Sequence, residues 1–327
     1  MNPLVKKILL FCVGLLALAG FIYWADLGEI TRAFASISLG WLGGTMLLQF
    51  LTIALITWQW QLIAGHTGCK VPFMVMLHII MAGTFVESVT PAVKAGGEAA
   101  KVLLLKSKAG LATSQAVAIT GAQKVISTLP FLALNLLALP WFLSTVELDK
   151  TYTNITVTAL AFLTLFTLLL GLALAYPGIL TRFSKAPALH QGIRRFRGTL
   201  TGLAKPRKLT PVLSLSLVIW LLFALKAWLL GIGLGITPGF TAMAVITWLS
   251  YVVGMVPLLP GGMGAMEGST VLLLAPLGIT LAPALALALV IRFVTFWFPF
   301  LLSALWLTLS NLGLATGDRD HFGKMNT

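Results

Sequence analysis

The sequence has few charged residues and is dominated by apolar ones. Only 9% of its 327 residues are Asp, Glu, Lys or Arg, whereas 58% are hydrophobic and the mean hydropathy is +0.99. Soluble domains carry about 25% charged residues, and disordered chains are poor in large apolar side chains. Both classes are therefore excluded, and the composition indicates an integral membrane protein.

Acidic residues and cysteines are also scarce. The nine acids are scattered and predict no two-metal site, and the two cysteines, Cys12 and Cys69, predict neither a disulfide framework nor a zinc site. The chain also lacks the sequence signatures of metalloproteases and P-loop proteins, and we expect no cofactor. One enzymatic alternative stays open, in which Glu98 or Glu267 is a general base acting on a lipid-linked phosphate or sugar.

Long hydrophobic runs fill most of the chain. A membrane-spanning helix needs roughly 20 apolar residues. We therefore interpret residues 1–327 as a single transmembrane domain with no room for a soluble catalytic domain. The eight hydrophobic segments cover about 8–24, 39–64, 72–90, 111–142, 154–176, 210–234, 240–259 and 279–310.

Two distant stretches share one polar pattern. TPAVKAGGEAAKVLLL begins at Thr90 and LPGGMGAMEGSTVLLL begins at Leu259, which aligns Pro91 with Pro260 and Glu98 with Glu267. Pro interrupts a membrane helix, and an ionised Glu is costly at bilayer depth. A chain that carries this combination once in each half is typical of a transporter built from repeats. We assign one repeat to about 39–142 and the other to about 210–310.

Basic residues are concentrated in one loop. Residues 177–209 contain eight Lys and Arg side chains and no acid, which predicts a cytoplasmic loop by the positive-inside rule. The short loops around Asp26 and Glu29, and around Glu147 and Asp149, are acidic by contrast and are expected outside, so both termini would be cytoplasmic. The net charge of +13 comes largely from this inner face. We expect it to set the topology and to contact anionic lipid headgroups rather than nucleic acid. A prokaryotic cytoplasmic membrane is the expected location.

The predicted orientation makes the two repeats inverted. The segment 39–64 would run inward and its counterpart 210–234 outward. A full crossing at 72–90 would leave four following lysines outside, so we predict a re-entrant hairpin at 72–108 and, by symmetry, one at 240–278. The expected fold is an all-α polytopic membrane protein with about six full spans and two re-entrant hairpins.

Several charges fall deep in apolar segments. Lys124 and Arg292 occupy corresponding places after the two hairpins, and Lys226 lies in the middle of its segment. Such residues form buried ion pairs with Glu98 or Glu267, or snorkel to an interface, or bind a headgroup or an ion. The two glutamates have a further structural explanation, since a carboxylate in the first turn of a helix offsets the macrodipole.

The candidate substrate site has a surplus of positive charge. Five cations, including Lys94, lie near the two elements against three acids, including Glu87. The Gly runs are expected to add exposed backbone N–H groups that suit phosphate oxygens. The predicted substrate-binding residues are Glu98, Lys101, Lys124, Lys226, Glu267 and Arg292, and the structural motif comprises Pro91, Gly96, Gly97, Pro260, Gly261, Gly262 and Gly264.

The second element resembles the hallmark of a known membrane family. Its Pro-Gly-Gly-x-Gly-x-x-Glu pattern, from Pro260 to Glu267, is similar to that of the lysylphosphatidylglycerol synthase transmembrane-region family, flippase-like proteins of the UPF0104 type. The earlier segment with Pro91, Gly97 and Glu98 is similar to the family's Pro-x-x-x-Gly-Glu segment, although longer than its shortest versions.

The resemblance covers nearly the whole chain and implies a lipid translocase. It implies a midplane polar cavity that moves an anionic, phosphate-bearing lipid between leaflets. The soluble domain that transfers aminoacyl groups in full-length members has no counterpart in this sequence, so lysyl-lipid synthesis is not expected. Membrane lipids are the expected partners, with a lipid-synthesis enzyme or a second copy of the chain as further candidates. A non-catalytic member of a lipid-synthesis complex is the remaining alternative.

Overall fold

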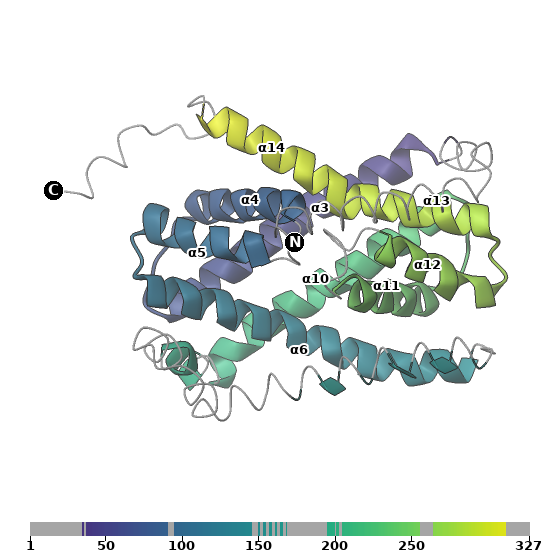
Figure 1. The fold of residues 1–327 in the computed structure, drawn as a ribbon, viewed down its shortest axis with the longest axis horizontal. Coiled ribbons are helices and arrows are strands. Elements are labelled where there is room, and N and C mark those ends of the chain that lie inside the picture. The colour runs from purple at the N-terminus through teal and green to yellow at the C-terminus, as the bar shows by residue number, and fades with distance from the viewer. Residues whose placement is uncertain are drawn as a thin grey trace, which may run out of the picture.

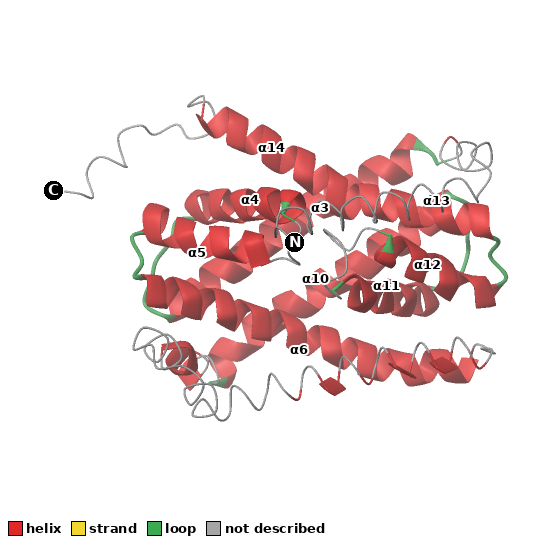
Figure 2. Ribbon diagram, in the orientation of Figure 1, coloured by secondary structure: helices red, strands yellow, loops and turns green. Residues whose placement is uncertain are grey.

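A computed structural model describes most of the two repeats. The described residues are 37–90, 95–145, 205–255 and 264–311, with residue 35 and scattered positions between 150 and 202. Across these ranges the ordered elements are helices joined by short loops, and no strand occurs in them (Figures 1 and 2). The protein is an all-α polytopic membrane protein, as the composition predicted.

Four helical runs are long and apolar enough to cross a membrane. They are α3 (Leu39–His66), α6 (Thr113–Thr145), α10 (Pro206–Gly233) and a continuous run that begins with α13 (Leu281–Arg292). That run continues through the π-helical turn η3 (Phe293–Trp297) into α14 (Phe298–Asn311). These helices match four of the six predicted spans. The other two, 8–24 and 154–176, lie wholly or almost wholly outside the described residues.

Two pairs of shorter helices form the predicted hairpins. The first pair is α4 (Phe73–Val89) with α5 (Ala95–Ala109), and the second is α11 (Phe240–Gly254) with α12 (Ala265–Leu274), which ends in the 3₁₀ turn η2 (Ala275–Leu277). At 17 residues α4 is roughly 26 Å long, short of a hydrocarbon core of about 30 Å. Helices of this length suit hairpins that enter the membrane without crossing it.

The two hairpins lie at opposite ends of the molecule. Figure 1 shows α4 and α5 at the left end and α11 and α12 at the right end. The loops that join each hairpin to its flanking long helices lie at the same outer end as the hairpin (Figure 2). The described helices of the two hairpins therefore extend from opposite ends of the molecule, which is the geometry that inverted repeats require.

The contact between α3 and α10 shows a reciprocal pattern. Counted from the first residue of each helix, Gln49 corresponds to Ser216 and Gln59 to Lys226. Gln59 donates a hydrogen bond through Nε2 to the Ser216 hydroxyl, and Lys226 donates through Nζ to the Gln49 side-chain oxygen. The eleventh residue of each helix therefore contacts the twenty-first residue of the other helix. A pseudo-twofold axis between the halves produces this reciprocal pattern.

The π-helical turn accounts for a one-residue difference between the repeats. Pro130 lies six residues after Lys124 inside α6, whereas Pro299 lies seven residues after Arg292. A π-bulge is a single-residue expansion of an α-helix, and η3 lies between Arg292 and Pro299. Pro299 also explains the bulge, since its ring crowds the preceding turn and it has no N–H to donate.

Apolar side chains form a core around each hairpin, and each core also includes residues of the other half, such as Val212 in the first and Phe142 in the second. One cluster includes Ile63, Met76 and Leu105 from α3, α4 and α5, and the other includes Leu249 and Leu285 from α11 and α13. Burial of aliphatic side chains at about 25 cal/mol per Å² does not by itself drive helix association inside lipid, where close packing matters more. The first hairpin also packs through α4 against α14, and the second through α11 against α6, so each hairpin contacts a long helix of the other half.

Glycine allows the first hairpin to close tightly. A Cβ added at Gly97 would lie 2.7 Å from both the Gly83 carbonyl oxygen and the Glu87 Cβ, so α5 rests directly on the backbone of α4. A Cβ at Gly83 would in turn lie 2.5 Å from the Lys101 side chain. Gly83 and Gly97 therefore position Glu87 and Lys101 across the hairpin.

Candidate functional site

A cavity of about 250 Å³ lies between the two halves. Three of its lining residues are cations that come from different helices: Lys101 from α5, Lys124 from α6 and Arg292 from α13. One lining residue is acidic, Glu87 from α4. The volume is below the roughly 300–1,000 Å³ of pockets that hold drug-sized ligands. The cavity therefore has room for a small chemical group only.

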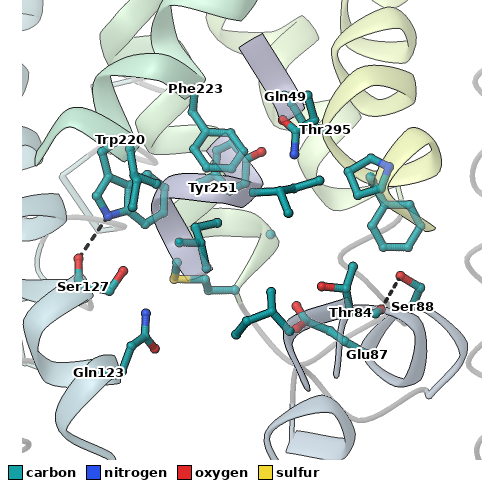
Figure 3. A pocket seen from close by; sticks show the side chains of 18 of the residues that line it. Gln49, Thr84, Glu87, Ser88, Gln123, Ser127, Trp220, Phe223, Tyr251 and Thr295 are labelled. Atoms are coloured by element: carbon teal, nitrogen blue, oxygen red, sulfur yellow. Dashed lines mark hydrogen bonds between the residues drawn. The ribbon is translucent and has the colours of Figure 1, made fainter. Parts of the chain in front are cut away.

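The remaining lining is neutral and comprises polar, aromatic and apolar residues, the apolar ones including Ile53, Ile80 and Met266. Figure 3 shows the side chains of Gln49, Gln123, Tyr251 and Thr295 arranged around the open centre, with Glu87 at the α4 side. The polar lining residues are Gln49, Gln59, Thr84, Ser88, Gln123, Ser127 and Thr295, and the aromatic ones are Trp60, Trp220, Phe223, Tyr251 and Phe296.

One carboxylate bridges two lysines in the first half. The Glu98 Oε1 atom lies 2.8 Å from Lys124 Nζ and 3.0 Å from Lys101 Nζ. Lys101 Nζ also lies 4.0 Å from Glu87 Oε2 and 5.3 Å from the centre of the Trp60 ring. The side chain of Lys124 is 43% exposed and that of Glu98 only 16%. Lys124 is therefore the more accessible member of this cluster.

A more deeply buried pair occupies the corresponding place in the second half. Arg292 Nε lies 3.3 Å from Glu267 Oε1, and the two side chains are 7% and 4% exposed. The guanidinium carbon lies 4.1 Å from the centre of the Phe296 ring. The second carboxylate oxygen of Glu267 accepts a hydrogen bond of 2.8 Å from the Gly264 N–H. Glu267 thus links the N-terminus of α12 to Arg292.

The glycines of the motif have a different role from the one expected for them. The Gly264 N–H is bonded to Glu267, and this glycine has φ of 78°, a left-handed conformation that favours Gly at the start of α12. Gly97 packs against α4. The expectation that these glycines offer backbone N–H groups to phosphate is therefore wrong for Gly264. Pro91, Pro260, Gly261 and Gly262 lie outside the described residues.

Lys226 belongs to the layer behind the cavity. It is fully buried, donates to the Gln49 oxygen and, over 3.1 Å, to the Thr52 hydroxyl, and lies 4.2 Å from the Phe223 ring centre. Within the described ranges no carboxylate lies within 4.0 Å of its Nζ. Its neighbours Gln49 and Phe223 line the cavity, whereas Lys226 itself does not. It is a neighbour of the site rather than part of the lining.

The cavity presents a positive surface. Four of the five predicted cations are described, and Lys94 lies outside these residues. Lys101, Lys124 and Arg292 line the cavity, whereas the carboxylates of Glu98 and Glu267 are not part of its lining. Fixed cations in a cleft with low-dielectric walls focus a field that attracts anions. Three of the predicted substrate residues thus converge on one cavity, with Glu87 in its lining and Glu98 and Glu267 outside it.

Sequence reasoning overlooked the neutral wall. Gln49, Gln59 and Gln123 lie inside segments predicted to span the membrane, where a buried amide needs a partner. Three glutamines in two apolar segments were therefore an available signal. Trp220, Phe223 and Tyr251 gave none, because aromatic residues are frequent throughout this chain.

Comparison with known proteins agrees with the membrane fold and the motif. The family model described as the lysylphosphatidylglycerol synthase TM region matches residues 11–303. The chain belongs to this family. Its similar relatives include a UPF0104 membrane protein of Pyrococcus horikoshii, 24% identical over 327 residues, covering 94% of this chain and 97% of the relative. A UPF0104 membrane protein of Methanothermobacter thermautotrophicus is 22% identical over 310 residues, covering 89% and 92%.

These relatives are membrane proteins of archaea. A third relative, from Methanocaldococcus jannaschii, is 20% identical over 314 residues, covering 91% of this chain and 93% of its own length, and is again a UPF0104 membrane protein. The family description refers to the membrane region of a lipid synthase, which relates the family to lipids.

Proposed function

We propose that this protein is a lipid translocase that moves an anionic, phosphate-bearing lipid between the two membrane leaflets. The observation that carries the proposal is the convergence of Lys101, Lys124 and Arg292, from both halves of the chain, on one cavity between two hairpins that extend from opposite ends of the molecule. A site shared by inverted repeats can open to either side when one repeat moves against the other.

Each charged residue has a distinct role in this proposal. The Arg292 guanidinium binds two phosphate oxygens through its planar fork of donors, and Lys124 acts as a mobile point charge. Glu98 and Glu267 hold the cations in position while the cavity is empty. When phosphate enters, its oxygens replace carboxylate contacts on Lys124, so the ammonium exchanges one anionic partner for another. The acyl or prenyl chains remain in the hydrocarbon.

The proposal predicts translocation by the purified protein. Reconstituted into vesicles, it should move fluorescent or spin-labelled phosphatidylglycerol to the opposite leaflet at least tenfold faster than protein-free vesicles do. A panel that also contains phosphatidylcholine tests the charge preference, because a positive cavity disfavours a choline headgroup. Equal, slow rates with and without protein across anionic lipids would contradict a translocase and favour the enzyme or scaffold alternatives.

The proposed orientation places both termini and the 177–209 loop in the cytoplasm of a prokaryotic cell. Cysteines introduced into this loop of a cysteine-free variant should be shielded from membrane-impermeant thiol reagents in intact cells, whereas a cysteine at Asp149 should be labelled. The physical reason is the retention of Lys and Arg on the inner face. Labelling of the loop from outside, before permeabilisation, would reverse the orientation.

A further inference from the structure

The part of the lining that the phosphate chemistry does not use is a neutral wall that extends around the open centre. Gln123 and Ser127 lie beside Trp220, and Gln49 lies beyond Phe223 and Tyr251, away from Gln123 (Figure 3). A purely apolar wall would be enough to exclude water from a phosphate site. The presence of amides next to rings calls for a ligand with hydroxyl groups and an apolar face.

Lys226 fixes the orientation of the Gln49 amide. A lysine ammonium has donors only, so the Gln49 atom that it binds must be the oxygen Oε1. The Nε2 donors of Gln49 then remain for the cavity that this residue lines. Lys226 is in this sense a positioning residue. Its role in the site is to orient the Gln49 amide. This role explains why the chain buries Lys226 although no carboxylate of the described residues lies close to it.

A second amide on α3, that of Gln59, is oriented by hydrogen bonds to α10. Gln59 Nε2 donates to the Val212 carbonyl oxygen at 3.0 Å and to the Ser216 hydroxyl, which leaves Oε1 as the acceptor for Gln123 Nε2 at 3.3 Å. Gln123 is thereby held by a partner that is itself held by α10. The wall therefore has fixed amide orientations and presents donors from Gln49 without reorganisation.

The aromatic surface is equally fixed. The Trp220 indole N–H donates to the Ser127 carbonyl oxygen over 3.0 Å, and its ring stacks on Phe131 at a centroid distance of 4.1 Å. Phe223 and Tyr251 meet edge to face at 5.1 Å. Rigid rings provide contact area at little cost in conformational entropy and suit the carbon-bound hydrogens of a polyol.

We propose that this wall binds a neutral, hydroxyl-bearing headgroup, a glycerol or a sugar, while Lys101, Lys124 and Arg292 bind the adjoining phosphate. The inference rests on the proposed function only in taking the ligand to be a lipid headgroup. It also excludes aminoacylated headgroups as preferred ligands. An added ammonium would face three lining cations and a single lining acid, Glu87, which lies 4.0 Å from Lys101.

Binding to the purified full-length protein in detergent tests this inference without requiring transport. The probes are short-chain phosphatidylglycerol, phosphatidylpropanol, which has the same charge but no hydroxyls, and lysylphosphatidylglycerol, which adds an amine-bearing group. Two hydrogen bonds at about 0.5–1.5 kcal/mol each predict that phosphatidylglycerol binds about tenfold tighter than phosphatidylpropanol. Lysylphosphatidylglycerol should bind at least tenfold more weakly than phosphatidylglycerol.

Two variants separate the wall from the phosphate site. Gln49→Met should reduce the preference for phosphatidylglycerol over phosphatidylpropanol to about twofold, without weakening phosphatidylpropanol binding. Gln123→Met provides the same test if the first variant fails to fold. Gln61→Met is the matched control, because Gln61 lies on the same helix as Gln49 but donates to the Val71 carbonyl oxygen and does not line the cavity. The control should keep the full preference.

The outcomes distinguish this inference from the translocase proposal. Equal binding of phosphatidylglycerol and phosphatidylpropanol, no binding of either, or tight binding of lysylphosphatidylglycerol would each overturn the inference, even if transport is observed. The expected preference, lost in Gln49→Met or Gln123→Met and kept in Gln61→Met, supports it. The same preference in a protein that moves no lipid would refute the translocase and leave the headgroup site in place.

Discussion

Replacing Glu267 by Gln is expected to lower the free energy of unfolding by about 3 to 5 kcal/mol, because it leaves Arg292 buried without its carboxylate. The pair is 3.3 Å apart and both side chains are almost fully buried. Gln is the informative replacement, since its side-chain oxygen can still accept the hydrogen bond from the Gly264 N–H at the start of α12. The change thus removes the charge and keeps the cap.

A second substitution then separates stability from transport. Arg292→Leu combined with Glu267→Gln removes both charges, and replacing a whole buried ion pair by neutral groups is often tolerated. We expect this double variant to regain most of the lost stability in chemical unfolding of the purified protein. In vesicles it should transport anionic lipid at least tenfold more slowly, because the loss of charge-assisted hydrogen bonds at about 1.5–3 kcal/mol each removes the forked phosphate donor.

A matched control tests whether any buried polar pair in this hairpin would have the same effect. The Thr270 hydroxyl bonds the Ser250 hydroxyl over 3.0 Å between α11 and α12, and neither residue lines the cavity. Ser250→Ala with Thr270→Val should therefore keep the wild-type transport rate. If the Arg292 and Glu267 double variant is stable and transports at that rate too, Arg292 is a structural ion-pair partner and not a phosphate ligand.

The hairpins could be predicted from the charge distribution and the repeat. Four lysines after residues 72–90 argued against a full crossing, and the inverted symmetry placed the second hairpin at 240–278. The pairing of Arg292 with Glu267 was one of two interpretations, since the sequence places both deep in the second repeat. In the structure Arg292 Nε lies 3.3 Å from Glu267 Oε1, and Arg292 also lines the cavity. The ion pair and access to the cavity are therefore compatible.

Contacts between helices could not be predicted from the sequence. Lys226 resembled Lys124 as a lone cation in an apolar segment, but only the crossing of α3 and α10 shows that it binds Gln49 and not a carboxylate of the described residues. An ion pair with Glu98 was one of the alternatives for the buried cations, and the structure shows that Glu98 bridges Lys101 on its own helix and Lys124 on α6. Which face of a helix meets its neighbour depends on packing, and the low amphipathicity of such apolar helices does not reveal it.

This bridging arrangement changes the test that the first repeat needs. Removing both Glu98 and Lys124 would deprive Lys101 of its closest carboxylate and leave it with Glu87 at 4.0 Å. The single change Lys124→Leu is cleaner, because Glu98 keeps Lys101 at 3.0 Å. Lys124 is also 43% exposed, and partly exposed ion pairs contribute about 0–1 kcal/mol to stability.

We therefore expect Lys124→Leu to unfold within about 1 kcal/mol of the wild-type protein and yet to transport anionic lipid at least tenfold more slowly. The reason is that the most accessible of the three lining cations is lost while Glu98 stays paired. Lys124→Arg should retain most of the rate because it keeps the charge, and Lys106→Leu, on the exposed end of α5, should leave the rate unchanged. Wild-type transport by a folded Lys124→Leu protein would show that the first repeat supplies no phosphate ligand at this position, and that the cavity depends on Arg292 and Lys101 alone.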